Sequence, residues 1–158
     1  MRTIQDVLAH ADAAKLAVSL GELLGARETS VGYDALSRVE QIALCVEGLE
    51  REVSHGGFEQ YFASAAGDHA LDCVDALDEI GGHEAADLLR RALMIFGAAG
   101  PDPDREERTL QLEAMGERVP SKLEPLDDAF FDDHDDLKER MRAFVQSNVK
   151  GFSPASDV

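Results

Sequence analysis

The chain has no tryptophan, only two cysteines, and far fewer basic than acidic residues. Its 32 Asp and Glu residues outnumber 15 Lys and Arg, giving a formal net charge of −17 at pH 7. Such an excess argues against direct nucleic-acid binding, because phosphates would be repelled, and favours a basic protein partner. Neither Cys45 nor Cys73 belongs to a Cys-x-x-Cys motif, so we expect buried free thiols in a reducing compartment.

Long apolar runs are also missing. No run approaches the length of a membrane span, and Gln5, Asp6 and Asp12 interrupt the segment where a signal peptide would be apolar. We therefore expect a cytoplasmic protein without membrane contact. With 158 residues, 44% hydrophobic and 30% charged, the chain has the size and composition of one folded domain.

Apolar residues recur at intervals of three and four along most of the chain, which is typical of amphipathic helices. No segment shows strand alternation between turns. The pattern predicts an all-α domain of seven or eight helices over residues 1–150, followed by a flexible tail at 151–158. The first helix is apolar on two faces, which indicates burial or a contact with another subunit. We expect helix breaks at Gly25, Gly56-Gly57, Gly67, Gly81-Gly82, 97–103 and 120–125, and start signals at Asp34, Asp68 and Asp102.

Acidic residues are concentrated in two windows. Residues 68–89 contain seven acids and no base, and residues 124–139 contain eight acids and one lysine, so together they carry −14 of the net charge. At about 100° per helical residue, four acids of the first window share a stripe roughly 60° wide, opposite an apolar face. This stripe predicts a surface for a basic partner, or else a tolerated solvent-exposed face. It consists of Asp68, Asp72, Asp75 and Glu79.

The second window interleaves acids with Phe130 and Phe131. It lacks the central glycine and the ligand spacing of a calcium loop, so we predict no metal there. We expect Asp135 or Asp136 to cap the last helix. The window supplies the other candidate partner-binding residues, which are Asp127, Asp128, Asp132, Asp133, Asp135 and Asp136.

Signatures of catalysis are absent from the sequence. There is no Gly-x-Ser-x-Gly or P-loop motif, and His69 with Cys73 provides only two of the ligands that a zinc site needs. We predict no catalytic, cofactor-binding or metal site, no cofactor and no enzymatic activity. An enzyme with a carboxylate site is the alternative, and a pocket of converging carboxylates with raised pKa values would favour it.

The segment SHGGFEQYF, residues 54–62, predicts a glycine joint followed by a short helix with Phe58, Tyr61 and Phe62 facing inward. Its GGFxQYF pattern, followed by Gly67-Asp68, resembles the core of a bacterial all-helical family first catalogued as a domain of unknown function, which includes a DNA-mimic protein. The resemblance covers about residues 36–149. The chain departs from the family pattern at His55 and at 63–64, where Asn is common. Other matches lie at 76–81, 85–89, Arg105, Arg108 and 126–131.

The resemblance implies an all-α fold. It also implies an acidic surface that imitates DNA phosphates, occupies the DNA-binding surface of a transcription regulator, and belongs to a homodimer. Our leading hypothesis is therefore a non-enzymatic protein whose acidic residues bind a basic protein. The alternative is a helical protein-interaction or immunity-type module that uses a mainly apolar contact surface, with acidity serving only solubility.

Overall fold

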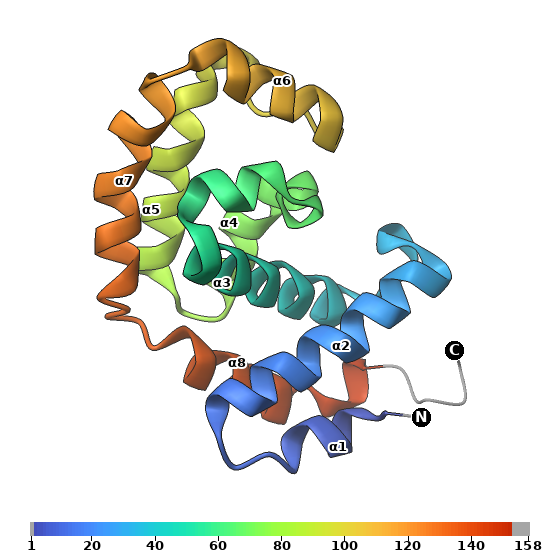
Figure 1. Cartoon of the computed structure of the whole chain (residues 1–158). Helices are drawn as coiled ribbons and strands as arrows, with labels where there is room; N and C mark the ends of the chain where they lie inside the picture. The colour runs from blue at the N-terminus through green and yellow to red at the C-terminus, as the bar shows by residue number, and fades with distance from the viewer. Residues whose placement is uncertain (1, 153–158) are drawn as a thin grey trace.

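Residues 2–152 are described by this computed structural model, and within them the chain forms eight α-helices, four short 3-10 helices and no strand. The prediction of an all-α fold with seven or eight helices is confirmed. Figure 1 shows their arrangement. In chain order the elements are α1 (Ile4–Leu8), α2 (Ala13–Val31), η1 (Tyr33–Ala35), α3 (Arg38–Ala63), η2 (Ala65–His69), α4 (Ala70–Glu79), α5 (His83–Leu93), η3 (Met94–Ala99), α6 (Arg105–Met115), α7 (Arg118–Phe131), α8 (Leu137–Ser147) and η4 (Val149–Gly151).

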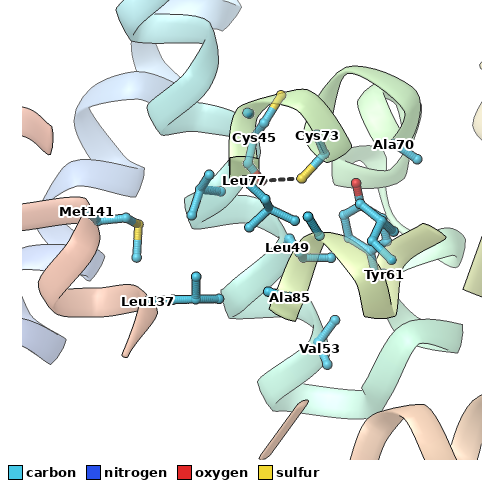
Figure 2. Packing of buried hydrophobic residues seen from close by; sticks show 14 of the residues in the cluster. Cys45, Leu49, Val53, Tyr61, Ala70, Cys73, Leu77, Ala85, Leu137 and Met141 are labelled. Atoms are coloured by element: carbon cyan, nitrogen blue, oxygen red, sulfur yellow. Dashed lines mark hydrogen bonds between the residues drawn. The ribbon is translucent and has the colours of Figure 1, made fainter. Parts of the chain in front are cut away.

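Helix α3 organises the core, because it packs against α2, α4, α6, α7 and α8. A reciprocal capping box between Ser37 and Glu40 starts it, which satisfies two backbone N–H groups at the helix end. Its apolar face then buries residues at helical spacing. Figure 2 shows Leu49 and Val53 of α3 beside Leu77 of α4 and Leu137 of α8, so segments far apart in sequence share one core.

The predicted glycine joint divides α3. Gly56 and Gly57 have non-helical backbone angles, and Gly57 has a φ of +77°, a region that glycine enters at little cost. Beyond the joint, Phe58, Tyr61 and Phe62 are buried, as predicted. Phe58 packs edge-on against Phe130 of α7, with ring centroids 5.7 Å apart. The joint therefore turns an aromatic segment into the core.

Arg108 of α6 is a fully buried cation. Its guanidinium donates to the carbonyl oxygens of Phe62 and Ser64 and to the loop before α6. It also pairs with the Asp68 carboxylate at 2.9 Å. Because a buried charge is costly unless it is paired and hydrogen-bonded, these contacts fix the end of α3 and η2 relative to α6.

The predicted boundaries of the N-terminal helices are wrong. Residues 4–24 are split into α1 and α2, because Thr3 and Asp12 each cap a separate helix. Gly25 lies inside α2, which continues to Val31. A β-carbon at Gly25 would have no neighbour within 4 Å, so the missing side chain leaves no gap in the packing of α2. Asp34 lies in η1, since the stronger start signal is the Ser37 capping box.

The predictions around the proline-rich segments are also wrong. Asp104 caps α6 in place of Asp102, since its carboxylate accepts from the Glu107 N–H. Pro120 lies in the first turn of α7, where its missing N–H is not needed. Pro125 lies inside α7, because the buried residues on both sides of it belong to one helix face.

The C-terminal part of the described chain is packed. Ser37 donates a hydrogen bond to the Gly151 carbonyl at 2.6 Å, and Phe152 is buried. Residues 153–158 of the predicted tail lie outside the described residues. None of the helices between residues 2 and 152 combines the length and apolar character needed to cross a membrane.

Candidate acidic binding surface

The predicted carboxylate stripe begins at Asp68, which lies in η2 and does not cap α4. Helix α4 starts at Ala70 with His69 in the cap position and without a side-chain cap. The Asp68 carboxylate is engaged by buried Arg108. Asp68 therefore neutralises an interior cation, a partner supplied from 40 residues further along the chain.

Asp72 is likewise occupied. Arg38 of α3 donates to both of its carboxylate oxygens at 3.0 Å, and the Tyr33 hydroxyl donates to one of them. Burial opposes ionisation of this carboxyl group, but the hydrogen bonds from Tyr33 and Arg38 outweigh burial and lower its pKa. Tertiary contacts thus place bases on a stripe that has none in its own sequence window.

The other half of the stripe is free. Asp75 and Glu79 are exposed, and within residues 2–152 neither carboxylate lies within ion-pair distance of a basic side chain. Asp78, between them in sequence, pairs with His83 and Arg90. Like charges one helical turn apart repel each other. A cation that approaches Asp75 and Glu79 therefore lowers their electrostatic free energy.

Three acids of the second window bind backbone N–H groups. Asp127 accepts from Phe58 at 2.8 Å, Asp133 from Leu137 at 3.2 Å, and Asp135 from Ala85 at 2.8 Å. These contacts cap the second half of α3 and the starts of α8 and α5. The prediction that Asp135 or Asp136 caps α8 is right for position alone. Asp136 is the cap residue, with a φ of +51°, but its side chain makes no cap bond.

The environment of Asp127 is strongly acidic. Burial raises the pKa of this carboxyl group, the Phe58 N–H opposes the rise, and Asp128, Glu124 and Glu59 add to it by repulsion. Glu59 is exposed, follows the glycine joint and lies 65 residues before the second window in sequence. Glu59 and Glu124 are not among the residues predicted from sequence, and only the packing of α3 against α7 reveals Glu59 as a member of this cluster.

Three further acids of the second window remain available. Asp128, Asp132 and Asp136 are exposed, and in the described part of the chain no basic side chain forms an ion pair with them. Together with Asp75 and Glu79 they make five of the ten predicted residues free. We call these five residues the acidic surface.

The two acidic windows meet at the turn between α4 and α5, which lies next to the start of α8 in Figure 1. The Glu84 carboxylate accepts from His134 at 2.9 Å, and Asp135 caps α5 from the same segment. The hydrogen bond with Glu84 raises the pKa of His134, with smaller contributions from Asp132 and Asp135. The sequence alone did not place the two windows together.

A pocket of about 430 Å³ lies between α2, α3 and α8. Its walls include Ala14, Ala17 and Val18, and two acids of α3, Glu47 and Glu50, converge on it. Glu47 is 3% exposed, and burial raises its pKa although Arg51 pairs with it. Glu50 pairs with Lys138. Neither glutamate was predicted as a site residue, because each lies in a helical pattern next to apolar residues without a distinctive motif.

A side chain at Gly21 would fill the space that the Glu47 carboxylate occupies, since a β-carbon there would lie 2.7 Å from Glu47 Cδ. The pocket is therefore built by a small residue on α2 facing a buried acid on α3. Each acid already has a basic partner, so the arrangement forms two ion pairs in an apolar wall.

The fold and these carboxylates define an all-α protein with a concentrated acidic surface. The chain belongs to the DMP19-like protein family, whose family model matches residues 34–148. This range agrees with the 36–149 of the sequence resemblance. No curated protein and no solved structure matches the chain.

Proposed function

We propose that this chain is a non-enzymatic, cytoplasmic protein that binds the basic surface of another protein through its acidic surface. One observation carries the proposal: five exposed carboxylates lack a basic partner within residues 2–152. Other acids of the same windows pair with arginines or accept hydrogen bonds from backbone N–H groups. Unpaired exposed acids repel one another, and a basic partner relieves that repulsion. They are Asp75, Glu79, Asp128, Asp132 and Asp136.

The proposal narrows the predicted site. Asp68 and Asp72 pair with arginines of this chain, and Asp127, Asp133 and Asp135 bind backbone N–H groups. The arginines compensate the charges of Asp68 and Asp72, whereas the other three acids still contribute negative potential, and none of the five is free to form new hydrogen bonds without cost. Direct contacts with the partner are therefore assigned to the acidic surface, and the remaining five residues support it.

The more specific form of the proposal is DNA mimicry, in which the partner is a transcription regulator and the acidic surface occupies its DNA-binding face. The family resemblance and the clustering of charge support it. Asp75 and Glu79 are four residues apart on α4, about 6 Å along the helix axis. Phosphates recur about every 3.4 Å along one DNA strand. The acids therefore form a sparser array, and the second window adds charges beside the α4–α5 turn.

The partner is sought by affinity capture from a lysate of the source organism, with elution by salt and by duplex DNA. Exposed charges interact over about 10 Å at 0.1 M salt and about 3 Å at 1 M salt. We expect the captured protein to be basic and to be released between these concentrations. Release by duplex DNA at 0.1 M salt supports mimicry, whereas a partner released by neither treatment contradicts the proposal.

A matched pair of variants then locates the contact. The test variant neutralises Asp75, Glu79, Asp128 and Asp132 as Asn or Gln. The control variant makes the same change of charge on α6 and at the residue before α7, at the other end of α5 from the α4–α5 turn (Figure 1). With about 0.5 kcal/mol for each exposed ion pair, the test variant should bind the partner roughly 10-fold to 100-fold more weakly. If both variants bound the partner equally weakly, affinity would depend on net charge and not on these positions, which contradicts the assignment of the contact to the acidic surface. The control residues are Glu106, Glu107, Glu113 and Glu117.

One observation favours the alternative of an apolar contact surface. Val18 of α2 is 61% exposed, and with Ala14 it lines both the 430 Å³ pocket and an adjoining hollow of about 350 Å³. Under this alternative, Val18→Asn weakens partner binding and the neutralised variant retains it. Binding by this surface also persists at 1 M salt, which separates it from the acidic surface.

A further inference from the structure

Two cysteines from different helices meet in the core. Cys45 of α3 and Cys73 of α4 are both free and buried, and the Cys73 thiol donates to the Cys45 carbonyl at 3.3 Å. Figure 2 shows the Cys73 sulfur directed at the Cys45 backbone and the Tyr61 hydroxyl on the same side, while the Cys45 sulfur points away from Cys73. On the other side, the Tyr33 hydroxyl lies 3.4 Å from Cys45 Sγ. The two thiols therefore stand in a row of polar groups that crosses an otherwise apolar core.

The two thiols differ in access. Cys45 is 6% exposed and lines a pocket of about 440 Å³ between α2, α3 and η2. Cys73 is fully buried and does not line that pocket. A small polar molecule that enters the pocket therefore reaches Cys45 first.

The two thiols also differ in acidity. The neighbouring Cys73 side chain and the Tyr33 hydroxyl lower the pKa of the Cys45 thiol, against the effect of burial. Burial raises the pKa of Cys73. Since the thiolate is the reactive form of cysteine, both access and acidity select Cys45 as the first site of oxidation.

We propose that Cys45 and Cys73 form a peroxide-sensitive pair, in which hydrogen peroxide oxidises Cys45 and Cys73 then closes an intramolecular disulfide between α3 and α4. In the first step the Cys45 thiolate attacks one peroxide oxygen, the O–O bond breaks, and sulfenic acid and hydroxide form. In the second step the Cys45 side chain rotates toward Cys73, the Cys73 sulfur attacks the Cys45 sulfur, and the S–O bond breaks. The sulfenic oxygen leaves as water with the Cys73 proton. Cellular thiols reduce the disulfide by exchange.

The first test treats the native full-length protein with hydrogen peroxide and follows it by intact mass and peptide mapping. We expect the loss of two hydrogen atoms and one cross-linked peptide pair containing Cys45 and Cys73. With Cys73→Ser, we expect a sulfenic acid on Cys45 that dimedone traps. With Cys45→Ser, we expect Cys73 to remain a thiol. Circular dichroism checks that each variant stays helical.

The second test asks whether peroxide enters through the pocket. Gly25 lines the pocket, and a β-carbon there would have no neighbour within 4 Å, so we expect Gly25→Leu to narrow the opening, with open space at the β-carbon. We expect this variant to form the disulfide more slowly, and protein unfolded in urea to lose the preference for Cys45. The proposal is overturned by sulfinic acid on Cys45 with Cys73 left as a thiol, by disulfides between chains, or by an unchanged rate in Gly25→Leu.

Discussion

The Asp127 carboxylate of α7 accepts a hydrogen bond from the Phe58 backbone N–H at 2.8 Å, directly after the glycine joint of α3. The joint interrupts the helix, so the second half of α3 begins with N–H groups that need acceptors. Asp127 supplies one acceptor from 69 residues away in sequence. The GGF pattern and an acid of the second window are thus two parts of one structural unit.

We predict that Gly57→Ala destabilises the protein by about 2 kcal/mol or more. A φ of +77° is unfavourable for alanine, and the new β-carbon would lie 2.7 Å from Asp127 Cγ. Urea unfolding followed by circular dichroism measures the change. Gly25→Ala is the control, because Gly25 lies in α2 with open space around it. There we expect stabilisation of up to about 1 kcal/mol.

Asp127 and Asp128 are neighbours in sequence with different roles. We predict that Asp127→Ala costs about 1 kcal/mol of unfolding free energy, the typical value of a lost helix cap. Asp128→Ala should change stability by less than about 0.5 kcal/mol, since Asp128 is exposed. The same urea titration compares them. Equal effects of the two substitutions would contradict the assignment of Asp127 as a cap.

Arg108 should be among the most sensitive residues of the chain. Arg108→Met leaves the Asp68 carboxylate and the Phe62 and Ser64 carbonyls without their donor, and we expect a loss of about 3–5 kcal/mol. Lysine should not rescue the fold, because one ammonium group cannot reproduce the fork of guanidinium donors.

The control for Arg108 is Arg105, which is exposed and, within residues 2–152, donates one side-chain hydrogen bond, to the Ala63 carbonyl. Arg105→Met should cost less than about 1.5 kcal/mol, the usual contribution of one such bond. Denaturant midpoints of the two variants give the comparison. If Arg105→Met were as destabilising as Arg108→Met, the buried arginine would not be the principal link between α3 and α6.

The pH dependence of His134 tests the meeting of the two acidic windows. Because Glu84 raises the pKa of His134, NMR titration should give a value above the ordinary 6.5, and Glu84→Gln should bring it down. Because the folded-state pKa is raised, protonated His134 stabilises the fold below pH 6.5. This contribution to stability is lost as the pH rises through the folded-state pKa. A His134 titration that Glu84→Gln leaves unaltered would show that the windows do not interact in solution.

Much of the fold was predictable because the relevant signals are local. Helical periodicity identified the all-α class, and paired glycines located the joints at 56–57 and 81–82. The errors came from single residues treated as breaks. Gly25 and Pro125 both lie inside helices, because a local cost of about 1–3 kcal/mol is smaller than the packing energy of a continuous helix face.

The sequence by itself determined the helical faces, the two acidic windows and the glycine joint, since each depends on spacing along the chain. Only the tertiary structure decided which acids are free. Asp68 and Asp72 look equivalent to Asp75 and Glu79 in the sequence, but they meet Arg108 and Arg38. Those partners come from other helices, and spacing within one helix does not specify what packs against it. The acidic surface is what remains after these long-range contacts have formed.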